Sequence, residues 1–209
     1  MNYSMIFYII GWILNVEAAL MIPSVVIAAI YQEKSGLAFV AVIALCLVPG
    51  FLLKNHPPRN KVFYAKEGAV TVALSWIIMS LMGALPFVLS GTIPNIVDAM
   101  FETVSGFTTT GASILTAIEG LPYCILFWRS FTHWIGGMGV LVFLLCLLPL
   151  TGGGYHMNLM KAESPGPSVS KLVPKVQATA KILYGLYLFL SVVEFVLLIA
   201  GKMPVFDAL

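Results

Sequence analysis

Long apolar runs, separated by short polar segments, make up most of the chain. A helix rises about 1.5 Å per residue, so about 20 apolar residues cross the roughly 30 Å hydrocarbon layer of a bilayer. Five runs approach or exceed this length, at 5–30, 37–53, 68–89, 122–148 and 182–200. Each is predicted to be helical, because backbone groups inside a bilayer must be hydrogen-bonded within their own segment. The expected fold class is therefore an all-α membrane protein.

Composition strengthens this prediction. Of the 209 residues, 60% are hydrophobic and only 10% are charged, whereas a soluble domain carries about a quarter charged residues. The net charge of +2 gives no reason to expect nucleic-acid binding. The first apolar run has no basic leading region and is too long for the core of a signal peptide, so we interpret it as a span.

The basic residues predict the topology. The polar segments 54–67 and 151–181 hold eight of the eleven Lys and Arg residues, four in each. The positive-inside rule then makes both segments cytoplasmic, and the N-terminus with them. Alternation puts Lys34 and Lys202 on the opposite side, and Arg129 falls within a span. This topology requires the stretch 91–121 to start and finish outside.

The stretch 91–121 contains the candidate functional residues. Thr92, Pro94 and Asn95 are helix-start residues, Asp98 follows in the first turn, and apolar residues then recur at helical spacing. The pattern predicts a helix over 95–106, about three turns long and too short to span. A small polar segment, FTTTGAS at 107–113, follows it. We interpret the two as a re-entrant pore loop, with a plain external surface loop as the alternative.

A re-entrant loop of this kind is suited to binding a cation. Its helix points a negative C-terminal end into the membrane, which favours a cation. The threonines and Gly111 can then present backbone carbonyls to a dehydrated ion, as potassium filters do. Glycine matters there because a carbonyl lining a pore can require a backbone angle that β-branched residues disfavour.

Four sequence segments together resemble one known family. They are DAMFETVSGFTTTGA at 98–112, LFWRS at 126–130, WIGGMG at 134–139 and KAESPGP at 161–167. In combination and order they are similar to the first pore unit of the TrkH/KtrB family of potassium uptake transporters. The two leading spans resemble the extra N-terminal helix pair of the TrkH branch, so the resemblance covers essentially the whole chain.

The resemblance implies a pore of four consecutive span–pore loop–span units around one axis, in the bacterial plasma membrane. It assigns Thr108, Thr109, Thr110 and Gly111 to the filter, with Thr109 and Thr110 as the carbonyls that contact K⁺. It further implies a homodimer and a cytosolic regulatory ring of nucleotide-binding subunits (TrkA/KtrA-like). No covalent cofactor is implied, and K⁺ is the transported ion.

A weak internal repeat predicts that the chain is a fragment. The segment GTIPNIVDAM at 91–100 is echoed by GKMPVFDAL at 201–209, with one residue fewer between Pro and Asp. Such echoes indicate duplicated units. We therefore divide the chain into an N-terminal helix pair (1–60), a first pore unit (61–150), a cytosolic connection (151–181) and the truncated start of a second unit (182–209).

Several charged residues lie inside apolar segments, where function is the default suspicion. For Glu17 and Glu194 we favour structural pairing, or protonation against a neighbouring helix, over a role in proton coupling. Glu102 is predicted either to hold the loop through backbone N–H groups or to concentrate K⁺, and we favour the first. Arg129 is expected to extend to the interface or to pair with Glu102 or Glu119.

The remaining motifs say less about function. Gly136, Gly137 and Gly139 lack the spacing of a dinucleotide fingerprint and are interpreted as small residues for close helix packing. No nucleophile–base arrangement or paired cysteine spacing is present in the sequence, so an enzyme is not expected. The leading hypothesis is a potassium pore subunit. The alternatives are a non-transporting membrane scaffold and, more weakly, a proton-coupled carrier.

Overall fold

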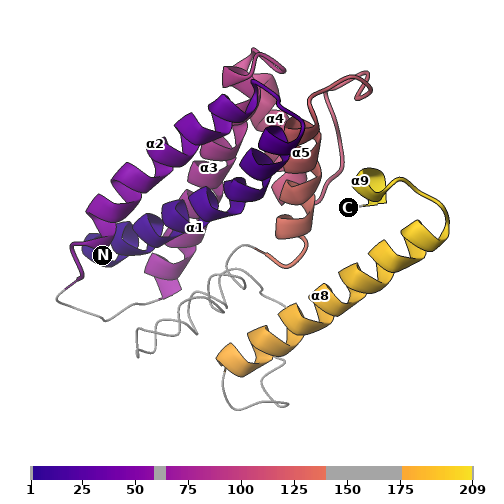
Figure 1. Cartoon of the computed structure of the whole chain (residues 1–209). Coiled ribbons are helices and arrows are strands. Elements are labelled where there is room, and N and C mark those ends of the chain that lie inside the picture. Colours follow the sequence, from indigo (N-terminus) through magenta and orange to yellow (C-terminus); the bar gives the residue numbers. More distant parts are fainter. Residues whose placement is uncertain (1, 59–64, 140–175, 209) are drawn as a thin grey trace.

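The computed structural model describes residues 2–58, 65–139 and 176–208. All regular structure in these residues is α-helical (Figure 1). The helices, in chain order, are α1 (Tyr3–Ile30), α2 (Gly36–Lys54), α3 (Ala65–Leu89), α4 (Ile96–Phe107), α5 (Tyr123–Gly136), α8 (Val176–Ala200) and α9 (Val205–Ala208).

Four of the five predicted spans are confirmed as helices long and apolar enough to cross a bilayer: α1, α2, α3 and α8. The fifth prediction, 122–148, begins as helix α5, and residues 140–148 lie outside the described part. Most of the predicted connection, 151–175, also lies outside it. The short helix predicted over 95–106 is α4, displaced by one residue.

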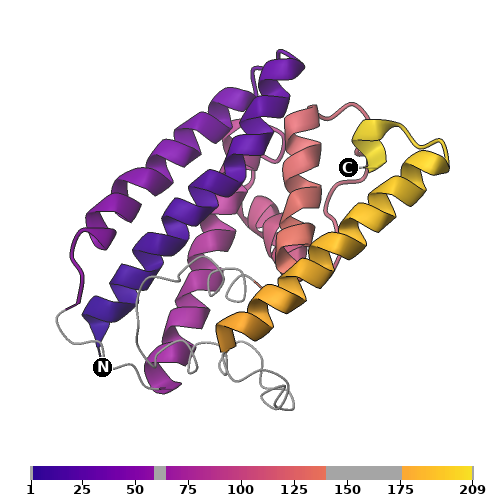
Figure 2. The ribbon, with the colours of Figure 1, turned by 60° about the horizontal axis from the view of Figure 1, so that its bottom comes forward.

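The first two helices form a tight antiparallel hairpin. At Gly11 an added Cβ would lie 2.8 Å from the Cβ of Leu53, and at Gly36 it would lie 2.6 Å from the Cβ of Ala28. Both distances are too short for real side chains, so glycine lets the two backbones approach. Helix α1 also packs against α3 and α5, while α4 lies between α3 and α5 (Figures 1 and 2).

The core is centred on Trp128 of α5, which is fully buried. Its indole N–H donates to the carbonyl of Gly83 in α3 at 2.9 Å, so the one polar atom of the ring is satisfied. Phe39 of α2 meets the ring edge-on, with centroids 6.1 Å apart. Three helices are therefore joined at one aromatic residue.

Helix α8 lies beside α5 and is fastened to it by polar contacts (Figure 2). The indole N–H of Trp134 donates to Ser191 Oγ at 3.0 Å, and the Tyr187 hydroxyl donates to the carbonyl of Trp134 at 3.0 Å. The apolar window of α8 has no buried residue. Its many exposed side chains suit contact with lipid or with further protein.

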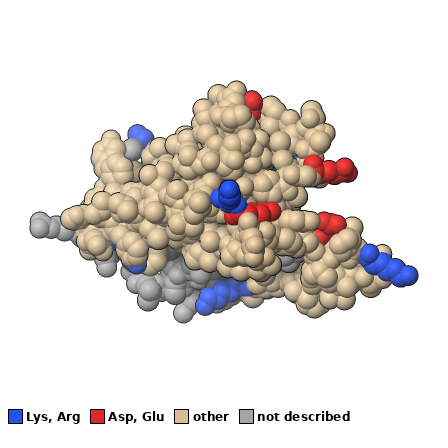
Figure 3. Space-filling model, turned by 45° about the horizontal axis from the view of Figure 1, so that its top comes forward, with Lys and Arg blue, Asp and Glu red and all other residues tan. Residues whose placement is uncertain are grey.

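The described surface is mostly uncharged. Figure 3 shows one face on which the Lys, Arg, Asp and Glu atoms of the described residues form a few small groups among side chains of other types. Large apolar side chains are exposed along α2 and α8, for instance Leu37 at 73% and Leu197 at 65%. Such a surface is expected of a protein whose solvent is lipid.

Candidate functional site

The candidate site begins at α4, whose start is fixed by its own sequence. The side chain of Asn95 caps the helix by accepting the N–H of Val97 at 3.0 Å, and Asp98 lies in the first turn. With 12 residues, α4 is about 18 Å long, well short of the roughly 30 Å of a hydrocarbon layer. The helix therefore ends part-way along its neighbours α3 and α5.

The end of α4 is a Schellman motif built from threonines. The N–H of Thr110 donates to the carbonyl of Ser105, and the N–H of Thr109 donates to the carbonyl of Gly106, each at 2.9 Å. This motif requires a left-handed residue, here Thr109 with φ of 56°. Glycine is usual at that position, and a residue with a Cβ costs roughly 1–2 kcal/mol there. Sequence reasoning missed this feature, because threonine does not signal a left-handed conformation.

The threonine hydroxyls turn back toward the helix end. Thr108 Oγ1 donates to the carbonyl of Val104 at 2.7 Å and lies 2.8 Å from Thr110 Oγ1. Thr109 Oγ1 donates to the carbonyl of Thr108 at 2.7 Å. These bonds engage the threonine hydroxyls and the carbonyl of Thr108. They do not involve the carbonyls of the residues that follow.

Three consecutive carbonyl oxygens follow. Among the residues that the structure describes, no group donates to the carbonyls of Thr109, Thr110 or Gly111, and all three residues are exposed in this chain. Gly111 has φ of 76°, and a Cβ added to it would meet nothing within 4 Å. Glycine is therefore required here by the backbone angle and not by space.

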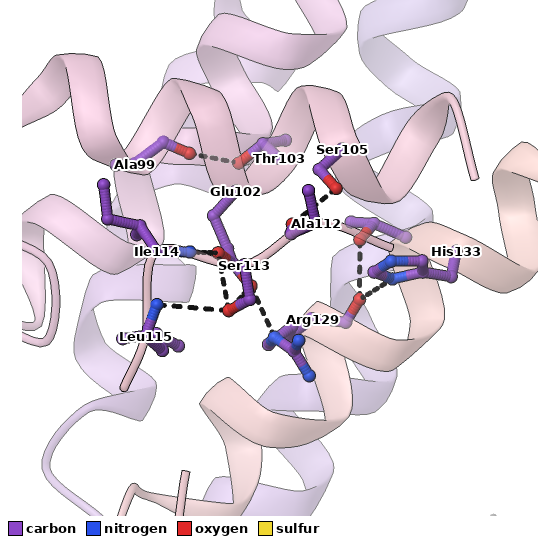
Figure 4. A network of polar contacts seen from close by, with 11 residues as sticks. Ala99, Glu102, Thr103, Ser105, Ala112, Ser113, Ile114, Leu115, Arg129 and His133 are labelled. Atoms are coloured by element: carbon purple, nitrogen blue, oxygen red, sulfur yellow. Dashed lines mark hydrogen bonds and ion pairs between the residues drawn. The ribbon is translucent and has the colours of Figure 1, made fainter. Parts of the chain in front are cut away.

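The segment 112–114, which follows Gly111, is held by two side chains of α4 (Figure 4). Ser105 Oγ donates to the carbonyl of Ala112 at 2.6 Å. The carboxylate of Glu102 accepts a hydrogen bond from the N–H of Ile114 at 3.0 Å. The hydroxyl of Ser113 donates to the same carboxylate and lies 3.0 Å from one of its oxygens and 3.1 Å from the other. The predicted holding role of Glu102 is thus confirmed. The Ser105 contact has no signal in the sequence.

Arg129 of α5 completes this network. Its Nε donates to Glu102 Oε1 at 2.5 Å, with the two side chains 20% and 1% exposed (Figure 4). A carboxylate buried to this degree is stable only when paired and hydrogen-bonded. Of the interpretations offered for Arg129, pairing with Glu102 is confirmed, while Glu119 lies exposed on the return segment. The opposite charges of Arg129 and Glu102 therefore compensate each other.

Glycines bring α4 and α5 into backbone contact. A Cβ added at Gly106 would overlap Thr132 Oγ1, and one added at Gly136 would overlap the carbonyl oxygen of Phe107. At Gly137 it would overlap the hydroxyl of Tyr187 on α8. The predicted packing role is therefore confirmed for Gly136 and Gly137. The end of α4 is pressed directly against α5.

The two glutamates of the apolar segments lie on different helices, Glu17 on α1 and Glu194 on α8. Glu17 is fully buried, and its Oε1 lies 3.6 Å from the position of a Cβ built on Gly83. Neither of its oxygens has a hydrogen-bond partner among the residues described. Glu194 is exposed on α8. Among the described residues no pairing partner is found for either carboxylate, and protonation against a neighbouring helix stays a prediction.

Comparisons with known proteins agree on one family. A family model described as TrkH, cation transport protein, matches residues 35–204. The TrkH potassium uptake protein of Salmonella typhimurium is 38% identical over the whole chain and 44% of that relative. TrkG of Escherichia coli is 33% identical over 95% of the chain and 41% of its own length.

A solved structure extends the agreement to the fold. The potassium transporter TrkH from Vibrio parahaemolyticus superposes with a TM-score of 0.78 at 30% identity, over 100% of this chain and 42% of that one. The chain thus spans less than half the length of the relatives it matches. A family match over most of its residues, from sequence and structure alike, places the chain in the TrkH family of cation transport proteins.

Proposed function

We propose that this chain supplies the first filter loop of a potassium uptake transporter. The observation that carries the proposal is the row of carbonyl oxygens at Thr109, Thr110 and Gly111, which follows the end of a short helix and accepts no hydrogen bond from the described part of the chain. Backbone carbonyls in such a row replace the hydration shell of a K⁺ ion. Thr108 belongs to the same filter segment, with its hydroxyl bracing the helix end.

Charge supports the same function. The C-terminal end of α4 carries about half a negative elementary charge from its aligned peptide dipoles. The positive charge of Arg129 is paired with Glu102 and does not oppose an arriving cation. The homologues named as potassium uptake proteins point to K⁺ as the ion.

In this proposal α4 is a re-entrant pore helix between α3 and α5, and span–pore loop–span units repeat along the complete protein. Helix α9 begins directly after Pro204 and α4 two residues after Pro94, which matches the shorter spacing of the second segment. The complete protein crosses the bacterial inner membrane with its N-terminus in the cytoplasm. It acts as a homodimer with a cytosolic nucleotide-binding subunit.

The proposal is tested by rubidium uptake into vesicles that hold the complete gene product. Gly111→Asp is compared with Gly120→Asp at matched membrane levels. Gly120 also has a left-handed φ, 88°, and a Cβ added to it would meet nothing within 4 Å. Both variants therefore add the same charge and the same backbone strain, and only one alters the filter segment.

We expect uptake by the wild type and Gly120→Asp that excess K⁺ blocks, and none by Gly111→Asp. Equal uptake by all three proteins would mean that Thr108–Gly111 does not line the pathway. A wild type that inserts fully but takes up no rubidium would favour the non-transporting scaffold instead.

A further inference from the structure

The turn between α1 and α2 reaches the pore unit through one carboxylate. Glu33 Oε1 accepts the backbone N–H of Tyr123 at 2.6 Å, and Oε2 accepts that of Cys124 at 2.9 Å. These are the first two residues of α5, ninety positions away in the sequence. A carboxylate that accepts N–H groups at a helix start satisfies orphan donors and complements the helix dipole.

Helix α5 has no cap of its own. The residue at its N-cap position is Pro122, which makes no side-chain cap hydrogen bond. Proline has no side-chain acceptor, so the two N–H groups depend on a distant residue. Glu33 itself is fixed in place, because its N–H donates to the carbonyl of Ala28 at 2.8 Å in the turn that ends α1.

An aromatic cluster surrounds this cap. Tyr31, two residues before Glu33, stacks on Tyr123 with ring centroids 4.2 Å apart. Phe206 of α9 packs edge-on against both rings, at 4.7 Å from Tyr123 and 6.1 Å from Tyr31. Three elements distant in sequence therefore meet where α5 begins.

The cap bears on the filter through α5. Arg129 lies six residues after Tyr123 on the same helix and donates to Glu102, which holds Ser113 and Ile114 of the return segment. The return segment is therefore held near Gly111 by Glu102, which contacts Ser113 and Ile114. Its other end, at the start of α5, is held by Glu33. A shift of the α5 start displaces Arg129, and with it the carboxylate that fixes the backbone after Gly111.

We propose that Glu33 is a positioning residue for the filter: the N-terminal helix pair sets the geometry of Thr109–Gly111 by capping α5. This inference rests on the proposed function. It gives the α1–α2 hairpin, which contributes no carbonyl to the row, a part in ion selection.

The test compares Glu33→Gln with Glu119→Gln in vesicles that hold the complete gene product at matched membrane levels. Glutamine keeps the shape of Glu33, but its amide offers one acceptor oxygen and turns an N–H₂ donor toward a backbone N–H. Glu119 is exposed near the same end of the molecule, so its variant removes the same charge without removing a cap. The readout is rubidium uptake competed by K⁺ or by Na⁺.

We expect Glu33→Gln to lower the preference for K⁺ over Na⁺, because α5 loses the cap that fixes its start. Glu119→Gln should leave the preference unchanged, and Glu33→Asp, which keeps both oxygens, should recover part of it. If Glu33→Gln does not reach the membrane, Glu33→Asp provides the measurement, with a smaller drop expected.

A second variant separates positioning from simple surface charge. In a double mutant with Glu102→Gln, the Glu33→Gln change should add little, because both act on the same anchor. Equal effects of Glu33→Gln and Glu119→Gln, or full additivity in the double mutant, would overturn the positioning role. A wild type without uptake would instead overturn the proposed function itself.

Discussion

Glu102→Gln is the substitution that most directly tests how the return segment is held. The carboxylate, 1% exposed, accepts from Arg129 Nε, from the Ser113 hydroxyl and from the Ile114 N–H. Glutamine fills the same space but has one acceptor oxygen, so its N–H₂ group must face one of these donors. The partly exposed guanidinium also loses its counter-charge.

The expected cost is about 3 kcal/mol, at the lower end of what is measured when one partner of a buried ion pair is removed. Because Arg129 is 20% exposed, water compensates part of the loss and the upper end of that range does not apply. The double mutant Glu102→Gln with Arg129→Gln should be less destabilised than the sum of the two single changes by at least about 1 kcal/mol.

The assay is thermal unfolding of the purified complete protein in detergent, with and without K⁺. An ion bound to the native state raises stability with concentration. We expect the wild type to gain stability with K⁺, and Glu102→Gln to unfold at lower temperature with little gain. The reasoning is refuted if Glu102→Gln matches the wild type in both respects, or if the two single changes are additive.

Three further predictions follow from the same geometry. Gly111→Ala and Gly120→Ala each cost about 1 kcal/mol of backbone strain, yet only Gly111→Ala should reduce rubidium uptake; a loss in both would assign the effect to strain alone. Gly106→Ala should prevent stable insertion by overlapping Thr132 Oγ1, and Thr132→Ala should restore part of the membrane level, measured by immunoblot. Thr109→Gly should raise the unfolding temperature by relieving the left-handed φ of 56°, with about 1 kcal/mol gained; unchanged or lower stability would contradict the strain assigned to Thr109.

The helices could be predicted from the sequence because their causes are local. Apolar runs of sufficient length gave α1, α2, α3 and α8, and Asn95 marked the start of α4 through its own cap. Long-range contacts were predictable only where a buried charge limited the choice of partner. Arg129 and Glu102 are the case in point, since an unpaired charge in an apolar segment is costly.

The remaining contacts depend on how helices approach one another in space. The bonds of Ser105 to Ala112 and of Glu33 to Tyr123 join ordinary polar residues that have many alternative partners. The left-handed Thr109 is imposed by the helix ending and opposes its own preference. The filter assignment, the membrane orientation, the division into units and the partners stay predictions.

The glycine contacts between α4 and α5 have a mechanical consequence. With Gly106 against Thr132 and Gly136 against Phe107, and with the ion pair beside them, the two helices have no room to slide past each other. A tilt of α5 therefore carries the end of α4 and the carbonyls of Thr109–Gly111 with it. Because hydrogen bonds of Trp134 and Tyr187 join α5 to α8, a force applied to α8 is transmitted through α5 to the end of α4 by leverage, without any change in the bonds of Thr108–Thr110.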